Sequence, residues 1–225
     1  SRKPSGTGTG LSVPLGAYDQ AISADGRYVA FTSLSTEFDS FAGDVEPSPT
    51  ASGTADIFVR DMTTTTAGLT TRATVSTSGG PLDADSAFPI MSSDARYVGY
   101  VTDASNAVDG DTNGVSDVVV RDRQRGVNHR GSLGPGLVQL TTDVHSPVIS
   151  GDGTYVGFTT RQTITSIDSN HADDTFLRLL VGPPTISGVS PTALTAGTAP
   201  TITVTGSGFA ANALPVVDGQ GVTVS

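Results

Sequence analysis

The residues best suited to chemistry lie in the segment 109–117, which reads DGDTNGVSD. Oxygen-bearing side chains stand at alternate positions, a glycine allows a sharp turn, and a carboxylate follows. A hard cation such as calcium prefers sets of oxygen ligands of this kind. The same composition is typical of an Asp/Asn/Gly turn that joins two strands without a metal. The segment is therefore either a calcium loop or a plain turn.

The spacing of this segment resembles the Asp-x-Asp-x-Asp/Asn-Gly-x-x-Asp loops of integrin-type β-propellers. The resemblance implies a calcium site with side-chain ligands Asp109, Asp111, Asn113 and Asp117 and the carbonyl of Val115. The segment departs from the EF-hand, because Val120 stands where that loop has its glutamate. A related loop aligns at 168–174, but Ser166 and His171 replace the first ligand and the glycine there.

No set of residues typical of a catalytic site is present in the sequence. There is no Gly-x-Ser-x-Gly elbow, and the single lysine, Lys3, stands in no Gly-Lys-Ser/Thr phosphate loop. His129, His145 and His171 lie far apart, and we expect them to be solvated loop residues. We therefore predict that the protein is not an enzyme and that calcium is its one cofactor; a hydrolase using paired aspartates is the weakest alternative.

Three similar segments form the elements that would position this loop. SADGRYVAFT at 23–32, SSDARYVGYVT at 92–102 and SGDGTYVGFT at 150–159 each read as a tight turn followed by a strand of alternating side chains. A further strand follows each of them, as DIFVRD at 56–61, DVVVRD at 117–122 and DTFLR at 174–178. Outer strands are predicted at 71–75 and 137–140, with none after the third copy. Four strands per repeat are typical of propeller blades.

These segments resemble the TolB-like β-propeller repeat over about residues 11–181. Ala95 and Thr154 depart from the pattern, where the first copy has Gly26 and Arg27. We expect the recurring Asp25, Asp94 and Asp152 to bind turn amides. The recurring arginines are expected to pair with strand aspartates or to cover neighbouring blades, unless they form a ring for an anionic ligand. They are Arg60, Arg121 and Arg178.

Three blades are fewer than the four to eight of typical propellers. A spare strand is predicted at 11–13, ahead of the first blade, after a flexible tail at 1–10. Two chains could form a six-bladed ring in which each N-terminal strand completes the last blade of the other chain. The alternative is that the chain is a piece of a longer propeller.

The C-terminal segment follows a Gly-Pro-Pro linker at 182–184. TISGVSP at 185–191 and TITVTGSGF at 201–209 resemble the opening strands of IPT/TIG immunoglobulin-like domains. Residues 185–225 amount to about half of such a sandwich. Either the remainder lies outside this sequence, or another chain adds the missing strands.

The composition excludes some classes of protein. A net charge of -10 argues against nucleic-acid binding, no cysteine is present for disulfides, and no apolar run is long enough to span a membrane. We predict an all-β fold with three four-stranded propeller blades and a partial immunoglobulin-like sandwich. The predicted function is structural or adhesive, at the cell surface or outside the cell, with the periplasm as a further location. Self-association through strand edges, as in a surface fibre, is the predicted partnership; the alternative is a propeller that binds a peptide or a glycan.

Overall fold

The computed structural model divides the chain into two compact units, Ser1–Leu180 and Val181–Ser225. It describes residues 16–34, 54–63, 70–165, 168, 170, 172–180, 185–190, 202–207, 216–217 and 220–221. The spare strand predicted at 11–13 and the linker predicted at 182–184 lie outside the described residues. The described secondary structure is almost entirely antiparallel strand, with one 3-10 turn at Pro135–Leu137. The all-β prediction is confirmed.

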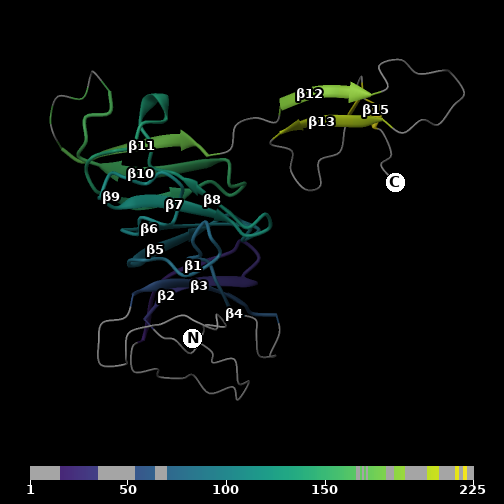
Figure 1. The fold of residues 1–225 in the computed structure, drawn as a ribbon. Helices are drawn as coiled ribbons and strands as arrows, with labels where there is room; N and C mark the ends of the chain where they lie inside the picture. Colours follow the sequence, from purple (N-terminus) through teal and green to yellow (C-terminus); the bar gives the residue numbers. More distant parts are fainter. Residues whose placement is uncertain are drawn as a thin grey trace, which may run out of the picture. The chain divides into compact units, whose positions relative to one another are not determined.

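The first unit contains two four-stranded antiparallel sheets of the same design (Figure 1). Sheet 1 has the order β1-β2-β3-β4, and sheet 2 has the order β5-β6-β7-β8. The strands of sheet 1 are β1 (Ala17–Ile22), β2 (Tyr28–Ser33), β3 (Asp56–Asp61) and β4 (Thr70–Arg72). The strands of sheet 2 are β5 (Ser86–Met91), β6 (Tyr97–Thr102), β7 (Asp117–Asp122) and β8 (Val127–Arg130).

Sheet 3 repeats the design with three strands: β9 (Val144–Ile149), β10 (Tyr155–Thr160) and β11 (Asp174–Leu179). Its order is β11-β10-β9, so β11 occupies the place of β3 and β7. Among the described residues no strand pairs with the far side of β11. The absence of an outer strand from the third repeat stays a prediction, because residues 181–184 lie outside the described residues.

The outer strand of sheet 2 does not lie where the sequence predicted it. The prediction of a strand at 137–140 is wrong, because β8 lies ten residues earlier along the chain, at Val127–Arg130. The segment after it contains the 3-10 turn and a single bridge from Leu133 to Gln139. Leu140 is 1% exposed, so its hydrophobicity reflects core packing and not strand pairing.

The tight turns that precede the second strands use the recurring aspartates as predicted. Asp25 Oδ1 accepts hydrogen bonds from Ser23 Oγ at 2.6 Å and from the amide of Arg27 at 2.9 Å. Asp94 and Asp152 accept the equivalent bonds in sheets 2 and 3. These bonds lower the pKa of Asp152 to about 2. The prediction that these three aspartates bind turn amides is confirmed.

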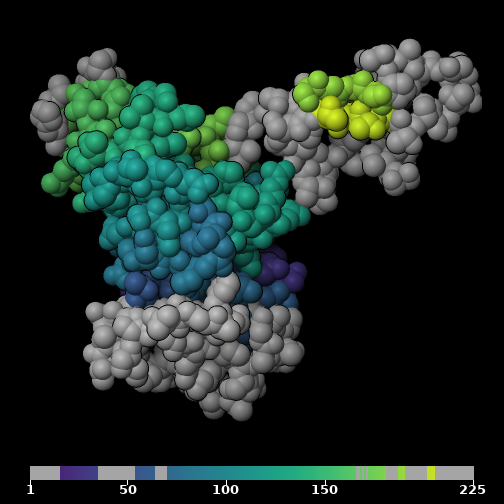
Figure 2. Space-filling view, viewed as in Figure 1, coloured from purple at the N-terminus to yellow at the C-terminus, as the bar shows by residue number. Residues whose placement is uncertain are grey.

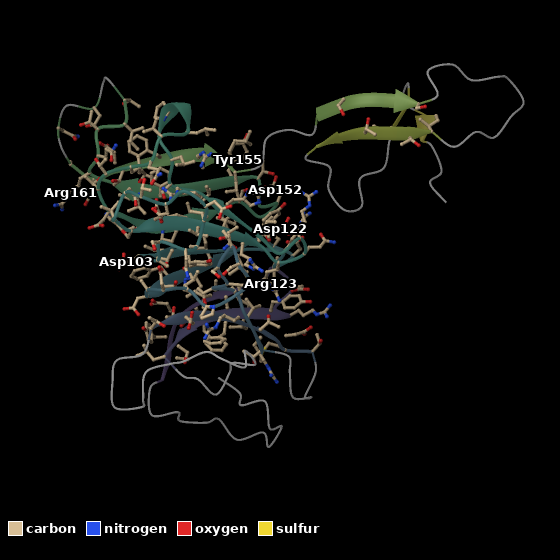
Figure 3. The ribbon with its side chains drawn as sticks, in the orientation of Figure 1. Asp103, Asp122, Arg123, Asp152, Tyr155 and Arg161 are labelled. Carbon is tan, nitrogen blue, oxygen red and sulfur yellow. The ribbon has the colours of Figure 1, made fainter. Side chains whose placement is uncertain are left out.

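The three sheets of the first unit are stacked on one another (Figures 1 and 2). Apolar side chains fill the space between sheets 1 and 2. Ile57 and Val59 of sheet 1 meet Val98, Tyr100 and Val119 of sheet 2 in one buried cluster. At one end of the strands, backbone hydrogen bonds join the turns of neighbouring sheets. Figure 3 shows Asp152 and Tyr155 at the same end of the strands as Asp122 and Arg123, with Asp103 and Arg161 at the opposite end.

In the second unit, two strands lie inside the segments that resemble an IPT/TIG domain. β12 (Thr185–Ser190) pairs antiparallel with β13 (Thr203–Ser207), and β14 (Val216–Val217) pairs with β15 (Gln220–Gly221). The immunoglobulin-like sandwich itself stays a prediction.

Candidate functional site

The loop predicted to bind calcium leads into β7, and an arginine from the neighbouring strand enters it. Arg130, the last residue of β8, places Nη2 2.9 Å from Asp111 Oδ1 and Nη1 3.5 Å from Asp117 Oδ2. The side chains of all three residues are at least nine-tenths buried. Sequence reasoning missed this arginine, because it lies on a strand that had not been predicted.

Asp117 is the centre of this cluster. Its Oδ1 accepts a hydrogen bond from Ser132 Oγ at 2.5 Å, and its Oδ2 accepts one from Asn113 Nδ2 at 3.0 Å. Burial raises the pKa of Asp117, and Ser132, Arg130 and Asn113 act in the opposite direction. The carboxylate is thus held by a hydroxyl, an amide and a guanidinium.

The predicted ligands are only partly brought together. Asp111, Asn113 and Asp117 meet around Arg130, whereas Asp109 is exposed and lines the pocket beside the cluster. The amide of Val115 donates to Asn113 Oδ1. This arrangement does not fit a calcium ion. The carboxylates of Asp111 and Asp117 already form ion pairs with Arg130, and the guanidinium would repel a calcium ion bound beside it. Across the described residues, no group of three or more acidic or histidine side chains could hold a metal. Calcium binding stays an untested prediction.

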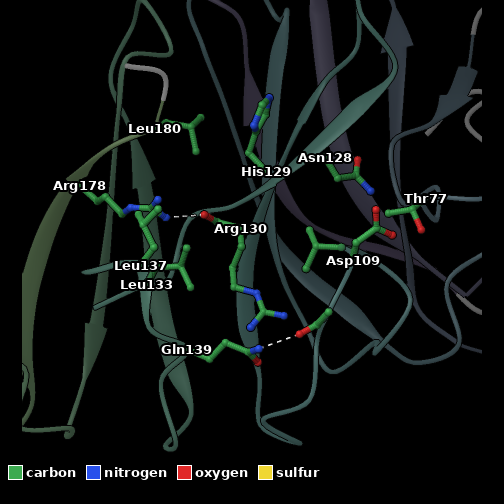
Figure 4. A pocket seen from close by; sticks show the side chains of 12 residues that line it. Thr77, Asp109, Asn128, His129, Arg130, Leu133, Leu137, Gln139, Arg178 and Leu180 are labelled. Carbon is green, nitrogen blue, oxygen red and sulfur yellow. Dashed lines mark hydrogen bonds between the residues drawn. The ribbon is translucent and has the colours of Figure 1, made fainter. Parts of the chain in front are cut away.

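A pocket of about 430 Å³ opens next to this cluster (Figure 4). It lies between the outer strand of sheet 2 and the third strand of sheet 3. Its lining includes Asp109, His129, Arg130, Gln139, Arg178 and Leu180. Arg178 Nη1 donates to the carbonyl of Arg130 at 2.6 Å, and Gln139 Nε2 donates to that of Gly110 at 2.7 Å. The pocket wall therefore combines fixed polar groups of both signs with apolar side chains.

The prediction that the histidines are solvated loop residues needs correction. His129 is not a loop residue: it lies on β8, is half-buried and lines the pocket, and burial lowers its pKa. His145 is exposed as predicted but lies on β9. His171 lies outside the described residues.

The recurring strand arginines do not pair with aspartates in the described contacts. Arg60 donates to Thr70 Oγ1, and Arg121 donates to Asn128 Oδ1. Arg178 reaches the neighbouring sheet, as one of the two expectations had it. Other arginines pair with aspartates in the described residues, and they include Arg27, Arg72, Arg96, Arg125, Arg130 and Arg161.

Sheet 3 leaves apolar side chains exposed on the face that points away from sheet 2. Leu177 is 71% exposed, although Val59 and Val120, at the same position of β3 and β7, are 1% and 0% exposed. Val148 and Tyr155 of the same sheet are 54% and 44% exposed. We call Val148, Tyr155, Leu177 and Leu179 the sheet 3 face. In sheet 2, Tyr97 at the position of Tyr155 is buried as well, at 8% exposed.

The structure thus defines an all-β protein built from repeated antiparallel sheets. No family model matches the chain, and no curated protein matches it. Among solved structures, the tricorn protease is similar at 13% identity and a TM-score of 0.43, over 75% of this chain and 14% of that chain. TolB from Acinetobacter baumannii is similar at 18% identity and a TM-score of 0.36, over 76% of this chain and 42% of that chain. The chain thus spans less than half of either structure.

None of the helical segments in the described residues is long and apolar enough to cross a bilayer.

Proposed function

We propose that this chain is a non-enzymatic β-propeller module of a surface or exported protein, and that it assembles by adding a further sheet to sheet 3. The added sheet comes from a second copy of the chain. Each repeat then acts as one propeller blade, and the module serves a structural or adhesive role. The periplasm and the cell surface are both compatible locations.

The exposure of the sheet 3 face is the observation that carries this proposal. Within the chain, each such face is buried by the next sheet, as Val59 and Val120 illustrate. Burying one leucine of this kind stabilises by about 1.5–3 kcal/mol. An exposed apolar sheet face of several residues is typical of an interaction surface. A further sheet of the same repeat would bury it in the way that sheet 3 buries sheet 2.

The titratable groups support a role without catalysis. Asp56, Asp117 and Asp122 are almost fully buried, and each forms an ion pair with an arginine of its own sheet. These buried carboxylates stabilise the pairing of strands, and they are not accessible to a substrate.

The solution mass of the chain tests this proposal. We expect light scattering to give at least twice the 22.8 kDa chain mass at micromolar concentration. A discrete dimer corresponds to a closed ring, and open-ended species correspond to a fibre. A strict monomer at all concentrations would contradict assembly through a second copy.

A matched pair of variants locates the contact. Leu177→Glu is expected to weaken association at least about tenfold, because it places a charge in the buried interface. Leu137→Glu is the control, since Leu137 is 69% exposed but lies outside the sheet 3 face. Equal loss of association in both variants would place the contact elsewhere.

A ligand-binding propeller is the second candidate, and the pocket beside Arg130 is the observation that favours it. His129, Arg178 and Gln139 supply polar groups at one side of a cavity large enough for a small ligand. A monomeric chain that binds a glycan or peptide library, and loses that binding in Arg178→Ala, would favour this function over assembly.

A further inference from the structure

Outer strand β4 is attached to sheet 1 by a short set of contacts that we call the outer-strand clasp. The amide of Ala73 donates to the carbonyl of Ile57 at 2.8 Å. Thr74 Oγ1 accepts from the amide of Ile57 at 3.3 Å and donates to Asp56 Oδ1 at 2.5 Å. Arg72 Nη2 lies 3.1 Å from Asp56 Oδ2. An arginine, a small residue and a hydroxyl therefore hold the first two residues of β3.

Sheet 2 repeats the clasp with different side chains of the same kinds. The amide of Gly131 donates to the carbonyl of Val118 at 2.6 Å. Ser132 Oγ accepts from the amide of Val118 at 3.0 Å and donates to Asp117 Oδ1. Arg130 again lies beside the aspartate. An apolar residue follows in both cases, so the clasp reads Arg-Ala-Thr-Val in sheet 1 and Arg-Gly-Ser-Leu in sheet 2.

β11 has the same groups that β3 and β7 use to bind their outer strands: an aspartate at its first position, and the amide and carbonyl of the next residue. Asp174 pairs with Thr160 in the ladder, as Asp56 and Asp117 pair with the last residues of β2 and β6. The amide of Leu180 donates to the carbonyl of Thr154 at 2.8 Å. Because hydrogen bonding alternates along an antiparallel ladder, the amide and carbonyl of Thr175 point to the free edge. No described residue hydrogen-bonds or ion-pairs with the Asp174 carboxylate.

The edge of β11 also lacks three features that protect exposed edges, namely lysine, proline and a bulge. The strand reads DTFLRL, without lysine or proline. Its pairing with β10 runs through six consecutive residue pairs without a bulge. Proteins usually block a free edge with such residues or with a bulge, so an unblocked edge is suited to strand addition.

We infer that the free edge of β11 docks an extended strand that reads Arg, a small residue, Ser or Thr, and an apolar residue. Its arginine and hydroxyl bind the Asp174 carboxylate, and its small residue donates an N–H to the carbonyl of Thr175. The strand belongs to a partner that carries this four-residue pattern. The inference goes beyond the proposed function, because it concerns the edge of β11 and not the sheet 3 face onto which a second copy stacks.

The N-terminal segment of a second copy is the alternative occupant. Lys3, Pro4 and Ser5 stand as far before Ser23 as the two clasps stand before Ser92 and Ser150. Pro4 has no N–H, so this segment lacks the backbone donor that Ala73 and Gly131 supply. The pattern with arginine and a small residue therefore fits the edge better.

A peptide that copies residues 70–76 is the probe for this edge. With the full chain, we expect binding by fluorescence anisotropy, together with slower hydrogen exchange of the Thr175 amide. Asp174→Asn should weaken binding about tenfold, since a charge-assisted contact is lost. Asp173→Asn is the control, because Asp173 is a neighbouring carboxylate that bonds to Arg161 and lies outside β11.

The outcomes separate this inference from the proposed function. Equal binding to wild-type and Asp174→Asn, or to a peptide whose arginine is replaced by alanine, would overturn the inference. So would stronger binding of a peptide that copies residues 1–7, which would assign the edge to a second copy's N-terminus. If no peptide binds but Leu177→Glu still reduces the mass, the inference fails and the proposed function stands.

Discussion

Gly153→Ala is expected to destabilise the protein by about 2–5 kcal/mol, the sum of a backbone cost and an overpacking cost. Gly153 lies in the turn before β10 with φ +72°, which L-residues adopt at a cost. A Cβ at this position would overlap Cδ2 of the Tyr97 ring in sheet 2. Tyr97 is 8% exposed, and the Arg96 guanidinium lies 4.8 Å from its ring centroid, so the ring has little room to move. Denaturant unfolding of the two proteins measures the loss.

Gly26→Ala is the matched control for this prediction. Gly26 holds the same place in the turn of sheet 1 with φ +71°, but a Cβ added there would meet no atom within 4 Å. We expect a loss of about 1–2 kcal/mol, which is the backbone cost alone. Ala95 shows that sheet 2 accepts alanine in this turn at φ 56°. Equal losses at the two glycines would mean that the contact with Tyr97 contributes nothing.

Arg130→Gln is expected to destabilise the protein by about 3 kcal/mol, because it leaves two buried carboxylates without their counter-charge. This loss of stability is at the lower end of the range for breaking a buried ion pair, since neither Nη atom of Arg130 makes an aligned hydrogen bond. Arg161→Gln is the control: its side chain is 74% exposed and pairs with Asp173 at the surface. Its loss should stay below about 1 kcal/mol. Similar losses in both variants would show that the cluster around Arg130 does not stabilise the fold.

Calcium should distinguish Arg130→Gln from the wild-type protein. We expect no calcium-dependent shift of the wild-type unfolding midpoint, because Arg130 supplies the positive charge between Asp111 and Asp117. In Arg130→Gln, calcium should restore part of the lost stability. Arg72→Gln should not respond, since Asp56 is the one acidic residue in the corresponding segment 48–56. A calcium-induced shift in the wild-type protein, abolished by Asp111→Ala, would support the metal site that the sequence predicted.

The repeat, the positions of the second strands and the turns before them could be predicted from the sequence. The alternation around Tyr28, Tyr97 and Tyr155 predicted the second strands, because side chains of a half-buried strand change face at every residue. Asp25 and Asp152 were assigned to turns for a local reason, since their carboxylates bind amides two residues along the chain. Hydrogen bonds between residues two positions apart can be predicted from the sequence, because both partners lie in the same short segment.

The outer strands and the composition of the candidate site could not be predicted, because they depend on contacts within the folded chain. A strand as short as β8 has only a weak pattern of alternating side chains. Leu140 was assigned to an outer strand at 137–140, because a residue buried in the core is apolar in the same way as a residue of a buried strand. Arg130 comes close to Asp111 and Asp117 only when β8 pairs with β7. The exposure of Leu177 likewise follows from which sheet faces are covered, and not from the residue itself. Contacts between segments distant in sequence depend on register and stacking, and these are set by the folded chain as a whole.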